Sequence, residues 1–107
     1  MAVFDWLRAW LAGPGSRGCA FINSFGELGA IETGVVRAAR DHKRAVLEYL
    51  TGLVADLNVG PPEVLAEQLL LLIDGAITTA AISGNPDAAL RARSAAQTLL
   101  SASKAEP

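Results

Sequence analysis

Residues 62–83 read PEVLAEQLLLLIDGAITTAAIS, and their apolar side chains fall on two opposite sides of one expected helix. Pro62 and Glu63 suit a first helical turn, where proline loses no needed hydrogen-bond donor and a carboxylate favours the helix dipole. A helix that is apolar on two sides has to be covered on two sides. The main apolar face is formed by Leu65, Leu69, Leu72, Ile73, Ala76 and Ala80. The second apolar side is formed by Val64, Leu71 and Ile82. The polar strip between them is formed by Glu67, Asp74 and Thr78.

Helical periodicity also marks the chain on both sides of this segment. Apolar residues recur at intervals of three and four, whereas no segment alternates apolar and polar residues with period two. Asn85 and Pro86 are expected to begin the last helix as its N-cap and its first residue. The sequence therefore predicts one all-α domain, residues 1–107, with five helices. The four further helices are expected near residues 2–12, 18–28, 33–58 and 86–102.

The balance of charges argues against a nucleic-acid partner for this chain. Nine Lys and Arg residues stand against eleven Asp and Glu residues, which gives a net charge of -2, and the basic residues form no stripe. Because phosphate contacts dominate the affinity for nucleic acids, the chain alone is not expected to bind DNA.

Cysteine usage and hydropathy predict a cytoplasmic protein. Cys19 is the one cysteine, so no disulfide can form within the chain, and a lone thiol suits a reducing compartment. Asp5 and Arg8 interrupt what would be the apolar part of a signal peptide, so no export signal is expected. The apolar run 69–82 contains Asp74 and is shorter than the roughly 20 residues that span a bilayer, so a buried helix is expected there.

Residues that could support catalysis or bind metal are scarce. Cys19 and His42 are the one candidate pair of nucleophile and base, yet they lie in different expected helices without a flanking motif. One cysteine and one histidine cannot close a structural zinc site. Gly13 and Gly15 indicate a turn, because no strand or phosphate-binding spacing accompanies them. The sequence predicts no enzyme, no cofactor and no metal site, with a buried, inert thiol at Cys19.

The aromatic residues of the first three expected helices leave two interpretations open. They form a pocket for a small molecule, with Asn23 and His42 as polar neighbours, or they simply fill the core. His42 is accordingly either a pocket donor or a partly buried polar group on the flank of an apolar stripe. The aromatic residues are Trp6, Trp10, Phe21, Phe25 and Tyr49.

The last two expected helices leave a second pair of alternatives. Helix 62–83 is apolar on two sides and helix 86–102 carries a face of alanines, so the two together need more cover than three short helices supply. A second copy of the chain, joined in a four-helix contact, would supply it. In the other interpretation, helix 62–83 is the central core helix of a monomer.

Several segments, taken in order, closely resemble the C-terminal domain of TetR-type transcriptional regulators. Their order and spacing carry the resemblance, which spans most of the chain. No single segment is a functional signature. The segments are RGCAFIN at 17–23, DHK at 41–43, LAEQLLLLIDGAI at 65–77 and GNPDAALRARSAA at 84–96.

The resemblance implies a homodimer in which the last two helices of each protomer form a four-helix bundle and the earlier helices enclose an effector site. The effector would be a small apolar molecule, and the alternative is a purely structural dimerisation module with a filled core and no ligand. The implied effector site comprises Trp6, Trp10, Phe21, Asn23, Phe25, His42, Tyr49 and Leu69. The implied dimer interface comprises Val64, Leu71, Gly75, Ala88, Ala92, Ala95, Ala96 and Leu99.

Members of the family begin with a three-helix DNA-reading unit that contains a helix-turn-helix, followed by a connecting helix. Nothing in this sequence corresponds to either. DNA binding and repression are therefore expected only of a full-length regulator, in which the effector would favour an arrangement whose two reading heads no longer match the operator.

Overall fold

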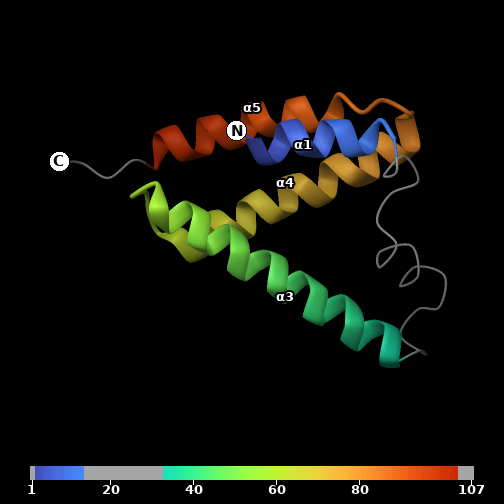
Figure 1. Ribbon diagram of the computed structural model, residues 1–107. Coiled ribbons are helices and arrows are strands. Elements are labelled where there is room, and N and C mark those ends of the chain that lie inside the picture. Colours follow the sequence, from blue (N-terminus) through green and yellow to red (C-terminus); the bar gives the residue numbers. More distant parts are fainter. Residues whose placement is uncertain (1, 14–32, 104–107) are drawn as a thin grey trace.

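The computed structural model describes residues 2–13 and 33–103, and every helix or strand assigned in these residues is an α-helix. This confirms the all-α prediction for the described part of the chain. The bounds of α1, α3 and α4 agree with the expected ones to within two residues, and the helix expected near 18–28 lies outside the described residues. The helices are α1 (Ala2–Leu11), α3 (Thr33–Asp56), α4 (Pro62–Ser83) and α5 (Ala88–Ala102) (Figure 1).

Helix α4 packs against each of the other three described helices. Extended Pro61 precedes it, and it ends at Gly84, whose φ of 74° lies in the left-handed region that glycine adopts most easily. The N–H of Gly84 donates to the carbonyl oxygen of Ala80 at 2.8 Å, which satisfies one carbonyl of the last turn. The buried residues of α4 are Leu65, Ala66, Leu69, Ala76, Ile77 and Ala80.

The second apolar side of α4 lies at the surface of the described chain. Val64, Leu71 and Ile82 are 48%, 72% and 84% exposed, respectively. Gly75 is exposed on the same side. The described residues therefore cover one of the two apolar sides of α4.

Helices α3 and α4 form a V whose apex is the turn at 57–61 (Figure 1). Near the apex, Leu50, Val54 and Val59 are buried in the core. Toward the start of α3, Arg37 and Arg40 are exposed. The two helices are thus held together mainly by the half of α3 that is closer to the turn.

The turn between α4 and α5 differs from the prediction by two residues. Helix α5 begins at Ala88 with Asp87 at the N-cap position, and Asp87 makes no capping hydrogen bond with its side chain. Asn85 instead accepts a hydrogen bond from the N–H of Asp87 through its Oδ1 atom, at 2.9 Å. This bond to the residue two positions ahead is an Asx turn, which competes with the N-cap role expected of asparagine.

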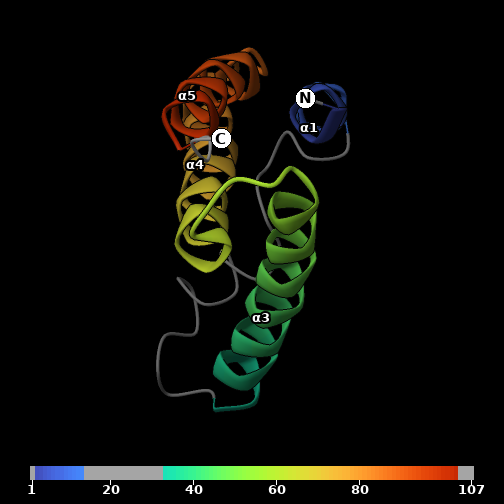
Figure 2. The same ribbon diagram turned by 90° about the vertical axis from the view of Figure 1, so that its left-hand side faces the viewer.

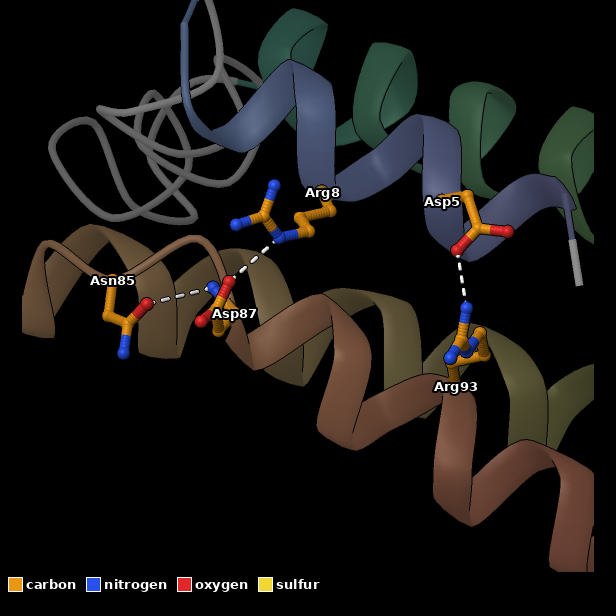
Figure 3. A network of polar contacts seen from close by, with 5 residues as sticks. All are labelled: Asp5, Arg8, Asn85, Asp87 and Arg93. Carbon is orange, nitrogen blue, oxygen red and sulfur yellow. Dashed lines mark hydrogen bonds and ion pairs between the residues drawn. The ribbon is translucent and has the colours of Figure 1, made fainter.

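Helix α1 lies along α5, and two ion pairs join them (Figure 3). Arg8 Nε contacts Asp87 Oδ1 at 2.7 Å, and Arg93 donates from a terminal guanidinium nitrogen to Asp5 Oδ1 at 2.7 Å. Because the later residue of α1 pairs with the earlier residue of α5, the two helices run antiparallel.

Helix α1 is apolar along one broad face, which carries Phe4 together with the residues Val3, Trp6, Leu7, Trp10 and Leu11 that recur at intervals of three and four. Phe4 is fully buried, and Leu7 and Leu11 are also buried, whereas Trp6 is 64% exposed. One edge of this face packs on the core beneath α5 and α4, and the edge that carries the tryptophans lines the space toward α3.

By length and composition, α4 is the one helix among the described residues that could cross a membrane. A core helix of a globular protein passes the same test. Asp74 in the second half of α4 forms an ion pair with Lys43 of α3, and the helix supplies six residues to the core. One side of α4 thus packs as a core helix does, and 33% of its apolar 18-residue window is buried.

Two leucine-to-alanine substitutions test which leucines lie in the core. Leu65 of α4 is 3% exposed, and Leu53 of α3 is 38% exposed. We expect Leu65→Ala to lower the free energy of unfolding by about 2–5 kcal/mol, because it removes buried methyl groups and leaves a cavity. Leu53→Ala should lower it by less than about 1 kcal/mol. Urea denaturation followed by circular dichroism measures both, and equal losses would mean that Leu65 does not lie in the core.

Candidate ligand-binding cavity

A cavity of about 410 Å³ lies between α1, α3 and α4. In Figure 2, α1 and the C-terminal part of α3 lie on the same side of α4, and α1 packs against α5 and α4. One wall comes from α1, one from α3 and the third from α4. The lining residues are Val3, Trp6, Leu7 and Trp10; His42, Lys43, Val46, Tyr49 and Leu50; and Leu70, Ile73, Asp74 and Ile77.

The α1 wall carries two stacked tryptophans. The ring centroids of Trp6 and Trp10 lie 6.1 Å apart and their planes differ by 10°, which is a parallel, offset arrangement. Across the cavity, Tyr49 of α3 is 61% exposed, comparable with Trp6. The exposed aromatic side chains place the opening of the cavity between α1 and α3.

Two oppositely charged side chains of the lining pair with each other. Lys43 Nζ of α3 lies 2.6 Å from Asp74 Oδ1 of α4, and the side chains are 29% and 27% exposed. The two charges cancel, so the pair adds polarity to the cavity wall without a net charge. His42 lies beside Lys43 in the same wall.

The structure brings four of the sequence-predicted effector residues together: Trp6, Trp10, His42 and Tyr49 all line the cavity. Leu69 does not, because it is buried in the core at 3% exposure. The α4 residues that line the cavity begin one position later than Leu69. They are Leu70, Ile73, Asp74 and Ile77. Phe21, Asn23 and Phe25 lie outside the described residues.

Sequence reasoning missed the remaining lining residues, including both members of the ion pair. The signal for Lys43 and Asp74 was present, since each is a charged residue on the flank of an apolar helix face. No local pattern predicts that the two residues pair, because 31 positions separate them in the chain. The aliphatic lining residues carry no signal that distinguishes a cavity wall from a core.

The residues predicted for a dimer interface divide into two groups. Val64, Leu71, Gly75 and Ala95 are exposed, and Ala88 and Leu99 are half-buried. Ala92 and Ala96 are buried inside the protomer, where α5 packs against α1 and α4. The small residues of α5 thus allow close packing within the chain itself.

The described part of the chain offers no cluster for metal chemistry. Within residues 2–13 and 33–103, no group of three or more His, Cys, Asp or Glu side chains could hold a metal ion. Cys19, the candidate nucleophile, lies outside these residues, so its distance from His42 is not described.

The chain was compared with protein-family models, curated proteins and solved structures, and none of them matches it. The residues and geometry of the cavity are therefore the basis for assigning its function.

The ion pair in the cavity wall should be coupled more strongly than an exposed pair. We expect a double-mutant cycle with Lys43→Gln and Asp74→Asn to give a coupling free energy of about 0.5–1.5 kcal/mol, because both side chains are shielded from most of the solvent. The same cycle with Arg8→Gln and Asp87→Asn should give less than about 0.5 kcal/mol, since those side chains are 45% and 43% exposed. Thermal and urea unfolding measure both cycles, and a larger coupling for the exposed pair would contradict the geometry.

Proposed function

We propose that this chain is the effector-binding and homodimerising domain of a TetR-type transcriptional regulator, and that its cavity takes a small apolar ligand. The observation that carries the proposal is the cavity itself. Its volume of about 410 Å³ falls in the range of about 300–1,000 Å³ typical of small-molecule sites. Apolar side chains form most of its lining, and a few polar groups lie among them, which is the composition of such sites.

The cavity also favours ligand binding over the alternative, a structural module with a filled core. In a filled core, Trp6, Trp10 and Tyr49 would pack against the other helices. Here Trp6 and Tyr49 are more than half exposed, and all three line one hollow space. Large apolar side chains held around an opening are available to a molecule that enters it.

The proposed dimer contact is the uncovered side of α4. Leu71 and Ile82 are 72% and 84% exposed, and Val64 lies on the same side of the helix. Gly75 lies between them and would let another backbone approach closely. A second copy related by a twofold axis would cover this side with the same residues, and would complete a four-helix bundle from α4 and α5 of both protomers. We also propose that the domain has five helices, the fifth being the helix expected near residues 18–28.

The regulatory mechanism follows from two-state binding. A ligand shifts a conformational equilibrium only by its difference in affinity for the two states. In a full-length regulator, a ligand that bridges α1, α3 and α4 would favour one arrangement of these helices and thereby one spacing of the DNA-reading heads. DNA is then a partner only of the N-terminal unit of such a regulator, and this domain works in the cytoplasm.

Filling the cavity from two opposite walls tests ligand binding. Val46 of α3 and Ile73 of α4 both line the cavity, and we expect the double variant Val46→Phe/Ile73→Phe to abolish binding of small apolar probes. The probes are decanol and N-phenyl-1-naphthylamine, and at least one should bind wild-type protein. Trp6 and Trp10 are the only tryptophans of the chain, so tryptophan fluorescence reports binding at the cavity wall. Native mass spectrometry gives the stoichiometry, expected to be one molecule per chain.

Leu57→Phe is the matched control, because it adds an aromatic ring at a residue that is 55% exposed and outside the cavity lining. It should leave binding unchanged. The ligand-binding proposal fails if neither probe binds wild-type protein, or if the filled variant binds as tightly as Leu57→Phe does.

A charge on the uncovered side of α4 tests the dimer. We expect wild-type protein to sediment as a dimer and Leu71→Arg to sediment as a monomer with unchanged helical content, because the arginine would place a like charge on both partners at the twofold contact. Leu57→Arg is the matched control, because Leu57 lies in the turn before α4, and this variant should remain dimeric. Analytical ultracentrifugation measures all three, and a monomeric wild type would refute the interface.

A further inference from the structure

The aromatic wall of the cavity favours a flat ring system. Trp6 and Trp10 have nearly parallel planes, so a planar molecule stacked on one tryptophan is also parallel to the other. Stacked aromatic pairs gain interaction energy beyond the area that they bury. A flexible acyl chain gains the apolar burial without this additional term.

The wall opposite the tryptophans is aliphatic. Leu70, Ile73 and Ile77 of α4 line it with branched side chains, and none of the three has a polar atom in its side chain. A ring held between this wall and the tryptophans therefore meets apolar atoms on its α4 side and indole rings on its α1 side. This part of the cavity offers no partner for a charged substituent.

The ion pair in the polar part of the lining has no net charge to offer a ligand. Lys43 and Asp74 are paired at 2.6 Å, and both are largely shielded from solvent. An anion that bound Lys43 would leave Asp74 without its cation, and a cation that bound Asp74 would leave Lys43 without its anion. Leaving one member of a shielded pair uncompensated is costly, so the intact pair disfavours both.

We propose that the cavity selects an uncharged, planar aromatic molecule, and that the Lys43–Asp74 ion pair excludes charged molecules of the same shape. This inference rests on the proposed ligand-binding function and names the class of ligand. Lys43 and Asp74 determine specificity here, while Trp6 and Trp10 supply the surface on which the ring stacks.

Two probes with the same ring skeleton test the charge selection. N-phenyl-1-naphthylamine is uncharged, and 1-anilinonaphthalene-8-sulfonate carries the same rings with one sulfonate. We expect wild-type protein to bind the uncharged probe about tenfold more tightly, which corresponds to about 1.4 kcal/mol. Decanol, which is uncharged and has no ring, should also bind more weakly than the uncharged probe. Probe fluorescence and energy transfer from the two tryptophans measure the affinities of the two aromatic probes and place them at the cavity, and displacement of the uncharged aromatic probe measures that of decanol.

Two variants test the role of the ion pair. Asp74→Asn leaves Lys43 without its anion, and we expect it to lower the ratio of the affinity for the uncharged probe to the affinity for the sulfonate probe about tenfold. The exchanged pair Lys43→Asp/Asp74→Lys is the control, because it restores neutrality with the charges reversed. It should bind the sulfonate probe as weakly as wild-type protein does. Circular dichroism checks that each variant is folded.

The outcomes separate this inference from the proposed function. If the sulfonate probe binds wild-type protein as tightly as the uncharged one, the ion pair does not select against charge. If decanol binds and the aromatic probe does not, the ligand class is wrong and the ligand-binding function stands. If no probe binds wild-type protein, the ligand-binding function itself is wrong.

Discussion

The rest of the structure depends on the need to cover an α4 helix that is apolar on two sides. Inner residues such as Leu65 and Ala80 are buried because α1, α3 and α5 all pack against α4. Each of those three helices is amphipathic or rich in small residues, and none of them packs against the side that carries Leu71 and Ile82. The apolar burial that stabilises the described chain and the uncovered apolar surface are thus on opposite sides of the same helix.

Helical periodicity was sufficient to predict the all-α fold and the extent of α1, α3 and α4, since caps and breakers flank these helices in the sequence. It could not decide which apolar residues face the core and which face the cavity. Residues 69–72 are four consecutive leucines, so the periodicity does not show which of them faces the core. Leu69, which was predicted for the effector site, is a core residue, while Leu70 lines the cavity. In α1, the side that meets α5 carries ion pairs such as Arg8–Asp87, whose members are 79 positions apart. Such pairing is a tertiary property with no local signal.

The cavity exists because α1 packs on α5 and α4 and leaves a space between itself and α3. Phe4 fixes one face of α1 in the core, which turns Trp6 and Trp10 toward that space. The ion pair between Lys43 and Asp74 then joins α3 to α4 at the cavity wall. The same contacts that stabilise the bundle therefore define the shape and charge of the site, and a molecule bound there would touch all three helices.

If the angle between α3 and α4 changed, α3 would turn about the 57–61 turn at the apex of the V. With a rise of about 1.5 Å per residue, Lys43 lies about 20 Å along α3 from Asp56, and Thr33 lies about 35 Å from it. A change in the angle of the V therefore moves the beginning of α3 almost twice as far as it moves the cavity wall. If the cavity widened by a fraction of an ångström, the N-terminal end of α3 would therefore move farther than the cavity wall does.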